Sequence, residues 1–180
     1  MAEIIDLFKL QKGVKRMLGT KTVSEEQAEK VLREYTAEGE AINPVLIAKK
    51  LGIRVVNAEF TNSDISGALQ INPDNTKIYV KHDDSPVRKR FTIAHELGHY
   101  FLHSDNQKDF IDQESLFFRN GEKNKIEIEA NDFAANLLMP KDRVLSQWKS
   151  LEDVYLLSVY FGVSMTAMKY RLKNLGVSID

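Results

Sequence analysis

The sequence feature that most constrains the fold is the segment His95-Glu96-Leu97-Gly98-His99. On an α-helix, side chains four residues apart lie on one face, one turn above each other. Two imidazoles so placed can converge on one metal ion. A glutamate next to the first histidine can then reach a water molecule near the metal and take its proton without becoming a ligand. The segment therefore predicts a helix that carries His95 and His99 as metal ligands and Glu96 as a general base, as in metallopeptidases.

The residues around this segment also favour a helix. Ser85 and Pro86 are typical of a helix start, with serine as the N-cap and proline at the first helical position. The residues that share one helical stripe after this start are Val87, Phe91, Ala94, His95, Gly98 and Leu102. This stripe places the first histidine on the side that faces the core. The alternative is that both histidines merely pack against the structure and are satisfied by hydrogen bonds.

A catalytic zinc site needs a third protein ligand and an open position for water. His103 is the nearest candidate, but three residues at four-residue spacing span about 12 Å along a straight helix, which is too far for one metal ion. We therefore expect His103 to end the helix or to support a ligand from behind. Because the chain contains no cysteine, the third ligand must be a histidine, an aspartate or a glutamate.

The segment from Lys125 to Pro140 supplies candidates for the third ligand. It is predicted to be a helix that ends before the proline, and its apolar stripe consists of Ala130, Ala134, Leu137 and Leu138. Glu127 stands at the top of this stripe and Asn131 follows one turn later, as a ligand and a polar residue supporting the site would. Glu129 aligns with the wetter side of the helix. The pattern favours Glu127, but it leaves open that Glu129 is the ligand or that both are ordinary surface glutamates.

The two segments together resemble the ImmA/IrrE family of metallo-endopeptidases. The stretches that carry the resemblance are residues 90–103, which read RFTIAHELGHYFLH, and residues 127–140, which read EIEANDFAANLLMP. The second stretch separates this family from many other proteins with the same histidine motif. The resemblance covers roughly residues 24 to 175 and implies a compact, thermolysin-like zincin core.

The resemblance implies a zinc-dependent endopeptidase, with the metal held by His95, His99 and Glu127 and with Glu96 as the base. Members of the family typically act in bacteria and their mobile elements, where they cleave or antagonise a helix-turn-helix repressor and so switch on stress or excision genes. The expected protein partner is therefore such a repressor. Imidazole and carboxylate ligands without a thiolate also suit manganese or iron, so Mn²⁺ and Fe²⁺ remain alternatives to Zn²⁺.

A second interpretation is a non-catalytic regulator that binds a partner repressor or DNA, with a structural or vestigial metal. The intact Glu96 argues against it, because a structural site does not need a base. An endopeptidase also needs a hydrogen-bond donor for the oxyanion that forms during cleavage. The sequence offers four possible donors without choosing between them, and these are Tyr79, His82, Tyr100 and Arg119.

Three short strands are predicted before the first metal-bearing helix. Residues 53–60 form one strand, and residues 67–72 and 77–81 form a hairpin around Pro73-Asp74-Asn75. In zincins, a strand edge beside the cleft binds the substrate backbone as an added strand. The hairpin could do so here, or it could merely cover the helix.

Other segments are predicted from local signals. The capping box Ser24-Glu25-Glu26-Gln27 opens a helix to about Glu38, with Gly39 as its stop. Asn43-Pro44 starts a short helix that ends at Gly52. Residues 104–124 form a long polar loop. Within this loop, the apolar run Leu116-Phe117-Phe118 could form a lid or a wall beside the cleft.

The C-terminal part of the chain is predicted to be helical. Residues 151–161 and residues 165–175 form two helices joined by a turn at Gly162-Val163-Ser164, which is similar to a helix-turn-helix. The second helix carries three basic residues, Lys169, Arg171 and Lys173. Because Arg171 points away from the other two, they do not form one basic stripe, and DNA binding is not expected.

These elements predict an α+β fold: a mainly helical zincin-like core with a small three-stranded antiparallel sheet and a C-terminal helix-turn-helix-like unit. The expected division is an N-terminal arm or helix at residues 1–23, the metallopeptidase core at residues 24–145, and a C-terminal helical part of the same domain at residues 146–180.

Charge and hydropathy limit which kinds of partner and which cellular location we expect for this protein. A formal net charge of −1 in 180 residues gives no overall attraction to nucleic acid or to anionic membranes. No apolar run approaches the roughly 20 residues that a membrane-spanning helix needs. The N-terminus lacks the basic start and long apolar stretch of a signal peptide. We therefore expect a cytoplasmic protein without a membrane partner.

Overall fold

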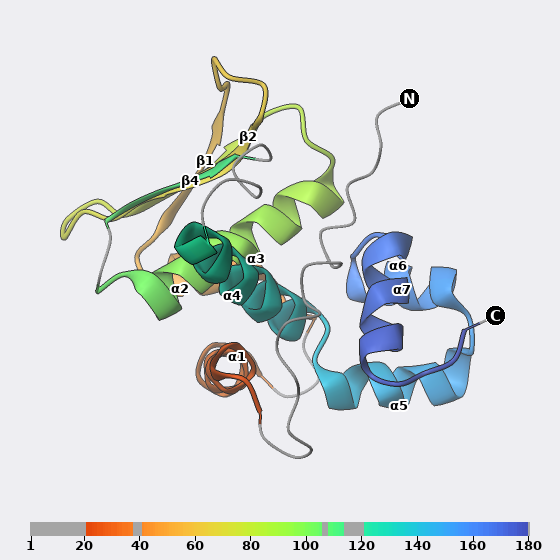
Figure 1. The fold of residues 1–180 in the computed structure, drawn as a ribbon. Helices are drawn as coiled ribbons and strands as arrows, with labels where there is room; N and C mark the ends of the chain where they lie inside the picture. Colours follow the sequence, from red (N-terminus) through yellow and green to blue (C-terminus); the bar gives the residue numbers. More distant parts are fainter. Residues whose placement is uncertain (1–20, 38–40, 106–107, 114–120, 180) are drawn as a thin grey trace.

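The computed structural model describes residues 21–37, 41–105, 108–113 and 121–179. The helices in these ranges are α1 (Val23–Tyr35), α2 (Pro44–Lys50), α3 (Pro86–His103), α4 (Gly121–Leu138), α5 (Lys141–Leu151), α6 (Val154–Phe161) and α7 (Met165–Asn174) (Figure 1). The strands are β1 (Arg54–Ala58), β2 (Ile65–Gln70), β3 (Lys77–Lys81) and β4 (Asp109–Gln113). The predicted α+β class is confirmed.

The sheet differs from the prediction, because it has four strands and is mixed. Its order is β1-β3-β2-β4. The β2–β3 hairpin is antiparallel, as predicted, but β1 pairs with β3 in parallel. The antiparallel hairpin brings β3 back to run in the same direction as β1. The fourth strand, β4, pairs antiparallel with β2 and lies inside the segment that the sequence predicts to be a loop.

This topology also changes which strand can pair with a substrate. Both strands of the hairpin have neighbours on both sides, whereas β1 and β4 are the terminal strands of the sheet. The idea that the hairpin offers its edge to a substrate is therefore wrong, since an added strand needs unpaired backbone groups. The strand β4 is missed because its sequence, DFIDQ, lacks a run of alternating apolar residues.

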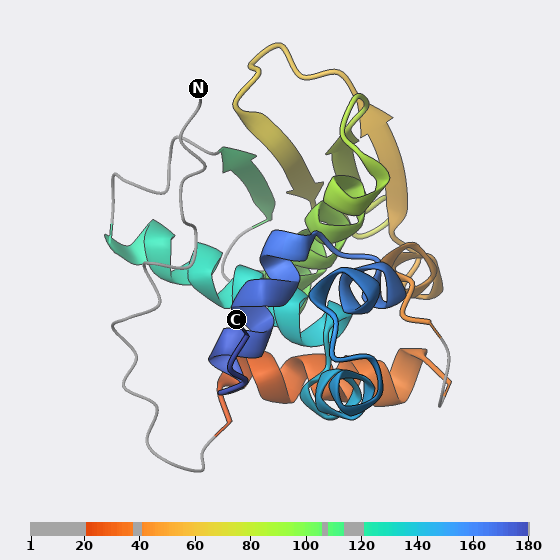
Figure 2. The ribbon, with the colours of Figure 1, turned by 90° about the vertical axis from the view of Figure 1, so that its right-hand side faces the viewer.

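One face of the sheet packs against α3, and the core continues through α4 to α1. Leu69, Ile78 and Val80 point from the sheet into this core. The helix α3 lies between the sheet and α4, and α1 lies on the far side of α4 (Figures 1 and 2). The two helices predicted to carry the metal ligands therefore occupy the centre of the molecule.

Local capping explains where two of the helices begin. The helix α3 starts as predicted, with the Ser85 hydroxyl oxygen accepting a hydrogen bond from the backbone N–H of Arg88 at 3.3 Å. The helix α1 starts two residues earlier than predicted, because its N-cap is Thr22, whose hydroxyl accepts from the backbone N–H of Glu25 at 3.0 Å. The same hydroxyl donates to Asp132 of α4 at 2.8 Å, so this cap also fixes α1 to the core. The helix α1 ends at Tyr35.

A glycine lets the two central helices approach closely. A Cβ atom at Gly98 of α3 would lie 3.0 Å from the Cα and carbonyl oxygen of Ala130 in α4. These are backbone atoms, which cannot move aside without moving the helix. The absence of a side chain at Gly98 thus sets how close α3 and α4 can come.

The C-terminal helices are shorter than predicted. The helix α5 ends at Leu151, where Glu152 adopts a left-handed conformation with φ of 46°, and the Asp153 side chain then caps α6. A single helix over residues 151–161 is therefore wrong. The turn at Gly162 is present as predicted, with a left-handed φ of 61°.

A buried arginine attaches this C-terminal unit to the core. The Arg171 Nε atom of α7 donates to the carbonyl oxygen of Met139 at 2.9 Å, and its guanidinium also donates to Asn136 Oδ1 of α4 at 2.8 Å. Arg171 is only 7% exposed. It is used inside the protein and does not belong to a DNA-binding surface.

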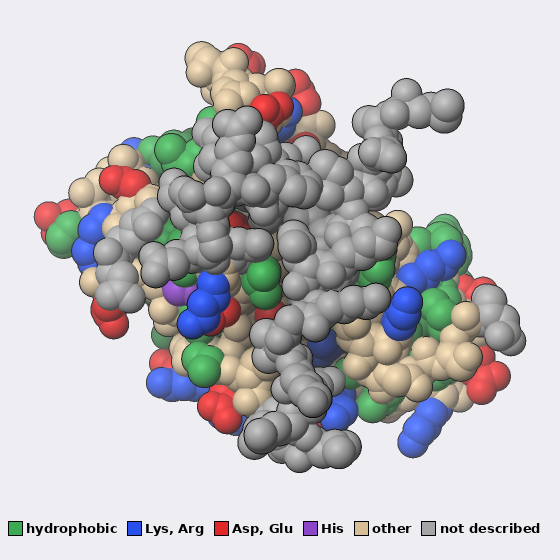
Figure 3. Space-filling model, in the orientation of Figure 1, with side chains coloured by type: hydrophobic (Ala, Val, Ile, Leu, Met, Phe, Trp, Pro, Cys, Tyr) green, Lys and Arg blue, Asp and Glu red, His purple; other side chains and the backbone are tan. Residues whose placement is uncertain are grey.

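The surface has no strongly charged face in the view of Figure 3. Acidic and basic side chains are interspersed over the described part of this face. Among the helices described, none has the length and apolar character needed to cross a membrane. The predicted N-terminal arm spans residues 1–23, and its first 20 residues lie outside the described residues, as do the helix stop at Gly39 and the apolar run at residues 116–118.

Candidate metal centre and active site

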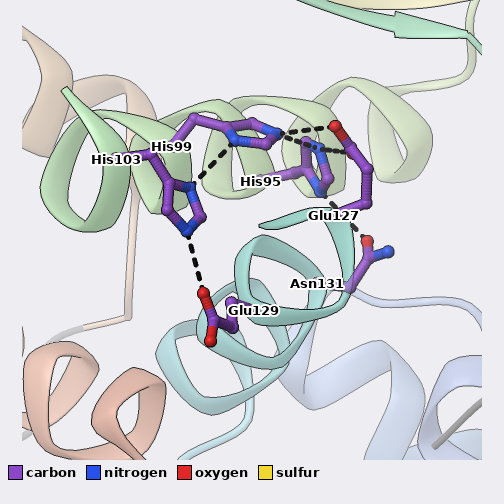
Figure 4. Close-up of polar contacts among 6 residues, drawn as sticks. All are labelled: His95, His99, His103, Glu127, Glu129 and Asn131. Carbon is purple, nitrogen blue, oxygen red and sulfur yellow. Dashed lines mark hydrogen bonds and ion pairs between the residues drawn. The ribbon is translucent and has the colours of Figure 1, made fainter. Parts of the chain in front are cut away.

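His95 and His99 of α3 converge with Glu127 of α4 on one point (Figure 4). The Nε2 atoms of the two imidazoles are 2.9 Å apart. The Glu127 carboxylate oxygens lie 3.1 Å from His95 Nε2 and 3.5 Å from His99 Nε2. In the part of the chain that the structure describes, this is the group of three residues that could hold a metal ion.

The structure distinguishes the two glutamates that the sequence leaves open. Glu127 points from α4 toward the two imidazoles, and its side chain is 18% exposed. Glu129 points instead to His103, with 3.1 Å between Glu129 Oε2 and His103 Nε2. Because successive side chains on a helix are separated by about 100°, two glutamates two positions apart cannot both face the cluster.

Burial sets the charge state of His99. It lowers the pKa of the His99 imidazole to about 4, because a charged ring loses its hydration inside the protein. The ring is therefore neutral at neutral pH and has a lone pair to offer to a metal ion. Burial raises the pKa of the Glu127 carboxyl, but hydrogen bonds and charge interactions with His95 and His99 outweigh this and hold it below its usual value.

Asn131 lies one helical turn after Glu127, as the sequence pattern suggests for a residue that supports the site. Its Oδ1 atom is 3.0 Å from His95 Nδ1. An amide oxygen only accepts hydrogen bonds, so His95 carries a hydrogen on Nδ1, and the neutral form of the ring then has its lone pair on Nε2. This is the form of the ring that can bind a metal through Nε2.

The donor set fits a divalent cation. Two imidazole nitrogens and a carboxylate face one point, and each of the three can offer an electron pair to a metal ion. A zinc ion with a catalytic role is commonly held by two histidines and one glutamate, with one further position left for water. The three residues therefore match a metal ion of this type in kind and in number.

Glu96 is fully buried and is not one of the three clustered residues. A Cβ atom at Gly67 of β2 would lie 2.9 Å from Glu96 Oε1 and 2.4 Å from Thr92 Cγ2. The carboxylate of Glu96 therefore lies between α3 and the sheet, in space that exists because position 67 has no side chain. This contact is not visible in the sequence, since nothing local links residue 67 to residue 96.

Phe110 of β4 packs against one of the three clustered residues and is a second feature that the sequence does not reveal. Its ring stacks on the His99 ring, with centroids 4.6 Å apart and planes 22° from parallel. Phe110 is buried. The strand β4 is thus held directly beside a candidate metal ligand.

None of the described oxyanion-donor candidates lies in the cluster. Tyr79 alternates along β3 with the buried Ile78 and Val80, so it is on the opposite face of the sheet from α3. His82 follows β3, and its backbone N–H donates to the carbonyl oxygen of Ala58 in β1, the terminal strand opposite β4. Tyr100 packs edge-on against the neighbouring Phe101. The fourth candidate, residue 119, lies outside the described residues.

With Glu96 as the base that the sequence predicts, Gly67→Ala should reduce peptide cleavage much more than stability. The new methyl group would displace the Glu96 carboxylate or Thr92, and misplacing a catalytic group by about 1 Å can lower a rate by about 100-fold. Peptide cleavage and metal content should be measured on the same preparation. The control is Ala68→Ser, which adds one atom on the opposite face of the same strand. Unchanged cleavage by Gly67→Ala would show that this contact does not position Glu96.

Acid should destabilise the metal-free protein. The His99 pKa is about 4 in the folded chain but near 6.5 when unfolded, so between these values the unfolded chain binds more protons. The free energy of unfolding should be greatest above about pH 6.5 and should fall as the pH approaches 4. Glu127, whose pKa is lowered, adds to the loss below its ordinary value of 4.5. Urea titrations with a chelator at several pH values measure this, and His99→Asn should flatten the dependence.

Comparison with known proteins gives one family and two curated relatives. The family described as the IrrE N-terminal-like domain, a family of peptidases, matches residues 48–173. "Uncharacterized immunity region protein 2" of Bacillus phage phi105 is 29% identical over 134 residues, which are 74% of this chain and 78% of the phage protein. "Metallopeptidase ImmA" of Bacillus subtilis (strain 168) is 29% identical over 118 residues, which are 62% of this chain and 64% of ImmA.

A solved structure supports the fold. A Mycobacterium tuberculosis transcriptional regulator aligns with 83% of this chain at a TM-score of 0.57 and 20% sequence identity. The alignment covers 46% of the regulator, and the chain also spans just under two thirds of the length of ImmA. The alignments with ImmA and with the regulator therefore each cover only part of those proteins.

Proposed function

The chain belongs to the ImmA/IrrE family of metallopeptidases, and from this we propose that it is a zinc-dependent endopeptidase that cleaves one specific peptide bond in a protein substrate. The observation that carries the proposal is the geometry of α3 and α4. They bring His95, His99 and Glu127 together, while Glu96 is buried on the same helix as the two histidines. This supplies three ligands and a base, the minimum that such a reaction needs.

Each residue has a distinct role in the proposed reaction. His95, His99 and Glu127 would hold the metal ion. When bound, the ion polarises the scissile carbonyl group and lowers the pKa of the attacking water. Glu96 accepts the proton of that water and passes it to the leaving amine.

The strand β4 is the proposed substrate-binding edge. It is a terminal strand of the sheet, and Phe110 fixes it beside His99. An extended peptide that pairs with β4 would therefore run past the metal centre. Since the substrate must be extended to bind in this way, cleavage should fall in a linker or a frayed helix end rather than in a stable helix.

The proposed substrate is a helix-turn-helix repressor of a bacterial stress response or mobile element. The names of the two relatives support this, since one is a metallopeptidase and the other belongs to the immunity region of a phage. A formal net charge of −1 gives no general attraction to DNA. A DNA-bound repressor would therefore be recognised through protein contacts.

The test is to mix zinc-loaded protein with the repressor encoded nearest to its gene and to identify fragments by mass spectrometry. A single cut in the repressor, absent with a chelator and absent in unrelated folded proteins, is the expected result. Digestion of every protein tested would contradict the proposed specificity. A stable complex without any cut would favour the non-catalytic regulator that binds its partner repressor.

A further inference from the structure

His103 and Glu129 form a chain of contacts behind His99. His103 Nδ1 is 3.2 Å from His99 Nδ1, and His103 Nε2 is 3.1 Å from Glu129 Oε2 (Figure 4). His103 is buried, and the Glu129 side chain is 35% exposed. The other oxygen of Glu129 lies 3.7 Å from Lys125 Nζ. His103, which lies too far along α3 to be a ligand, is thus in contact with His99. Glu129, which faces away from the cluster, is in contact with His103.

The chemistry of these groups allows one arrangement of hydrogens when His99 is a ligand. Its Nε2 atom faces the cluster and must carry a lone pair, so its hydrogen is on Nδ1. That N–H donates to Nδ1 of His103. The hydrogen of His103 is then on Nε2, from which it donates to the Glu129 carboxylate, which can only accept. The reverse arrangement would direct the His99 hydrogen at the other two ligands.

The two ligand histidines are therefore supported differently. His95 donates to the neutral amide oxygen of Asn131, whereas the support of His99 ends on a carboxylate. The His99 ring is also stacked on Phe110. The stack holds the plane of the ring, but it does not decide which nitrogen carries the hydrogen. That choice depends on His103 and Glu129.

We propose that His103 and Glu129 are positioning residues that hold the hydrogen of His99 on Nδ1 and so keep Nε2 available to the metal ion. This inference rests on the proposed metallopeptidase function. Groups that accept a hydrogen bond from a ligand histidine typically raise metal affinity about 10- to 100-fold. Here the carboxylate acts through a second imidazole, so both residues are needed for the full effect.

The first test compares the zinc affinities of His103 variants by competition with a chromophoric chelator. His103→Leu should bind zinc about 10- to 100-fold more weakly than the wild type. His103→Asn should recover most of this loss, because its amide oxygen can accept the hydrogen bond from His99. The control is His82→Leu, an exposed histidine after β3, which should bind zinc as the wild type does. Circular dichroism of the zinc-free forms checks that each variant folds.

The second test uses the partly exposed Glu129, where substitution is less disruptive. Glu129→Leu should weaken zinc binding about 10-fold, and Glu129→Gln, whose amide oxygen still accepts, should weaken it less. His103→Leu combined with Glu129→Leu should be no weaker than His103→Leu alone, because Glu129 acts only through His103. A purely structural role would instead give additive losses.

The hydrogens themselves can be located by NMR. Long-range ¹H–¹⁵N correlations of the zinc-loaded wild type should show His99 protonated at Nδ1 and His103 protonated at Nε2. A hydrogen on Nδ1 of His103, or wild-type affinity in both leucine variants, would overturn the inference while the metal site stands. A wild-type chain that binds no zinc would overturn the proposed function and this inference together.

Discussion

Glu96→Gln should abolish peptide cleavage while the protein keeps its metal and its fold. Glutamine has the same shape as glutamate, but its amide cannot take a proton from water at neutral pH. Loss of a general base lowers a rate by about 100- to 10,000-fold. Because Glu96 is fully buried between α3 and the sheet, water cannot readily replace its carboxylate. Fragment yield from the repressor, followed by mass spectrometry, measures the effect.

The matched control for this variant is Glu26→Gln, the same substitution at an exposed position of α1. It should cleave at the wild-type rate. Elemental analysis should find the same zinc content in all three proteins. Cleavage by Glu96→Gln at the wild-type rate would contradict the mechanism. Normal regulation in cells by a variant that cannot cleave would favour the non-catalytic interpretation.

Glu127→Ala should remove most of the bound metal, and Glu129→Ala should not. Glu127 supplies the only carboxylate of the described cluster, and two histidines on one helix do not complete a zinc site. Glu129 contacts the centre only through His103, so its loss weakens binding without emptying the site when zinc is in excess. Elemental analysis after dialysis against micromolar zinc distinguishes the two. Metal loss in Glu129→Ala alone would reverse the assignment.

The parts of the site that the sequence predicts are those with strong local signals. The spacing of His95 and His99 fixes their common face on any helix, and Ser85 marks where that helix begins. Helical spacing relative to an apolar stripe also favours Glu127 and places Asn131 one turn after it, but it leaves the choice between Glu127 and Glu129 open. In each case the prediction requires only that the segment is a helix and that its apolar stripe faces the core.

The parts that the sequence does not predict depend on contacts between distant segments. Nothing in the local sequence links Gly67 to Glu96, or Phe110 to His99, because each pair meets only when β2 and β4 pair and pack on α3. The parallel pairing of β1 with β3 is missed for the same reason. The contact of Thr22 with Asp132, which fixes the start of α1, also joins residues far apart in the chain.

The placement of the three clustered residues on two helices has a consequence for the unfolded chain. A metal ion that joins His99 to Glu127 closes a loop of about 30 residues, and in the chain-entropy view a cross-link of that size disfavours the unfolded state by about 3–4 kcal/mol. In a chain without cysteine, the ion would thus act as the covalent cross-link that the sequence lacks. Chelation would then loosen the packing of β4 beside His99 and expose this strand to other proteases.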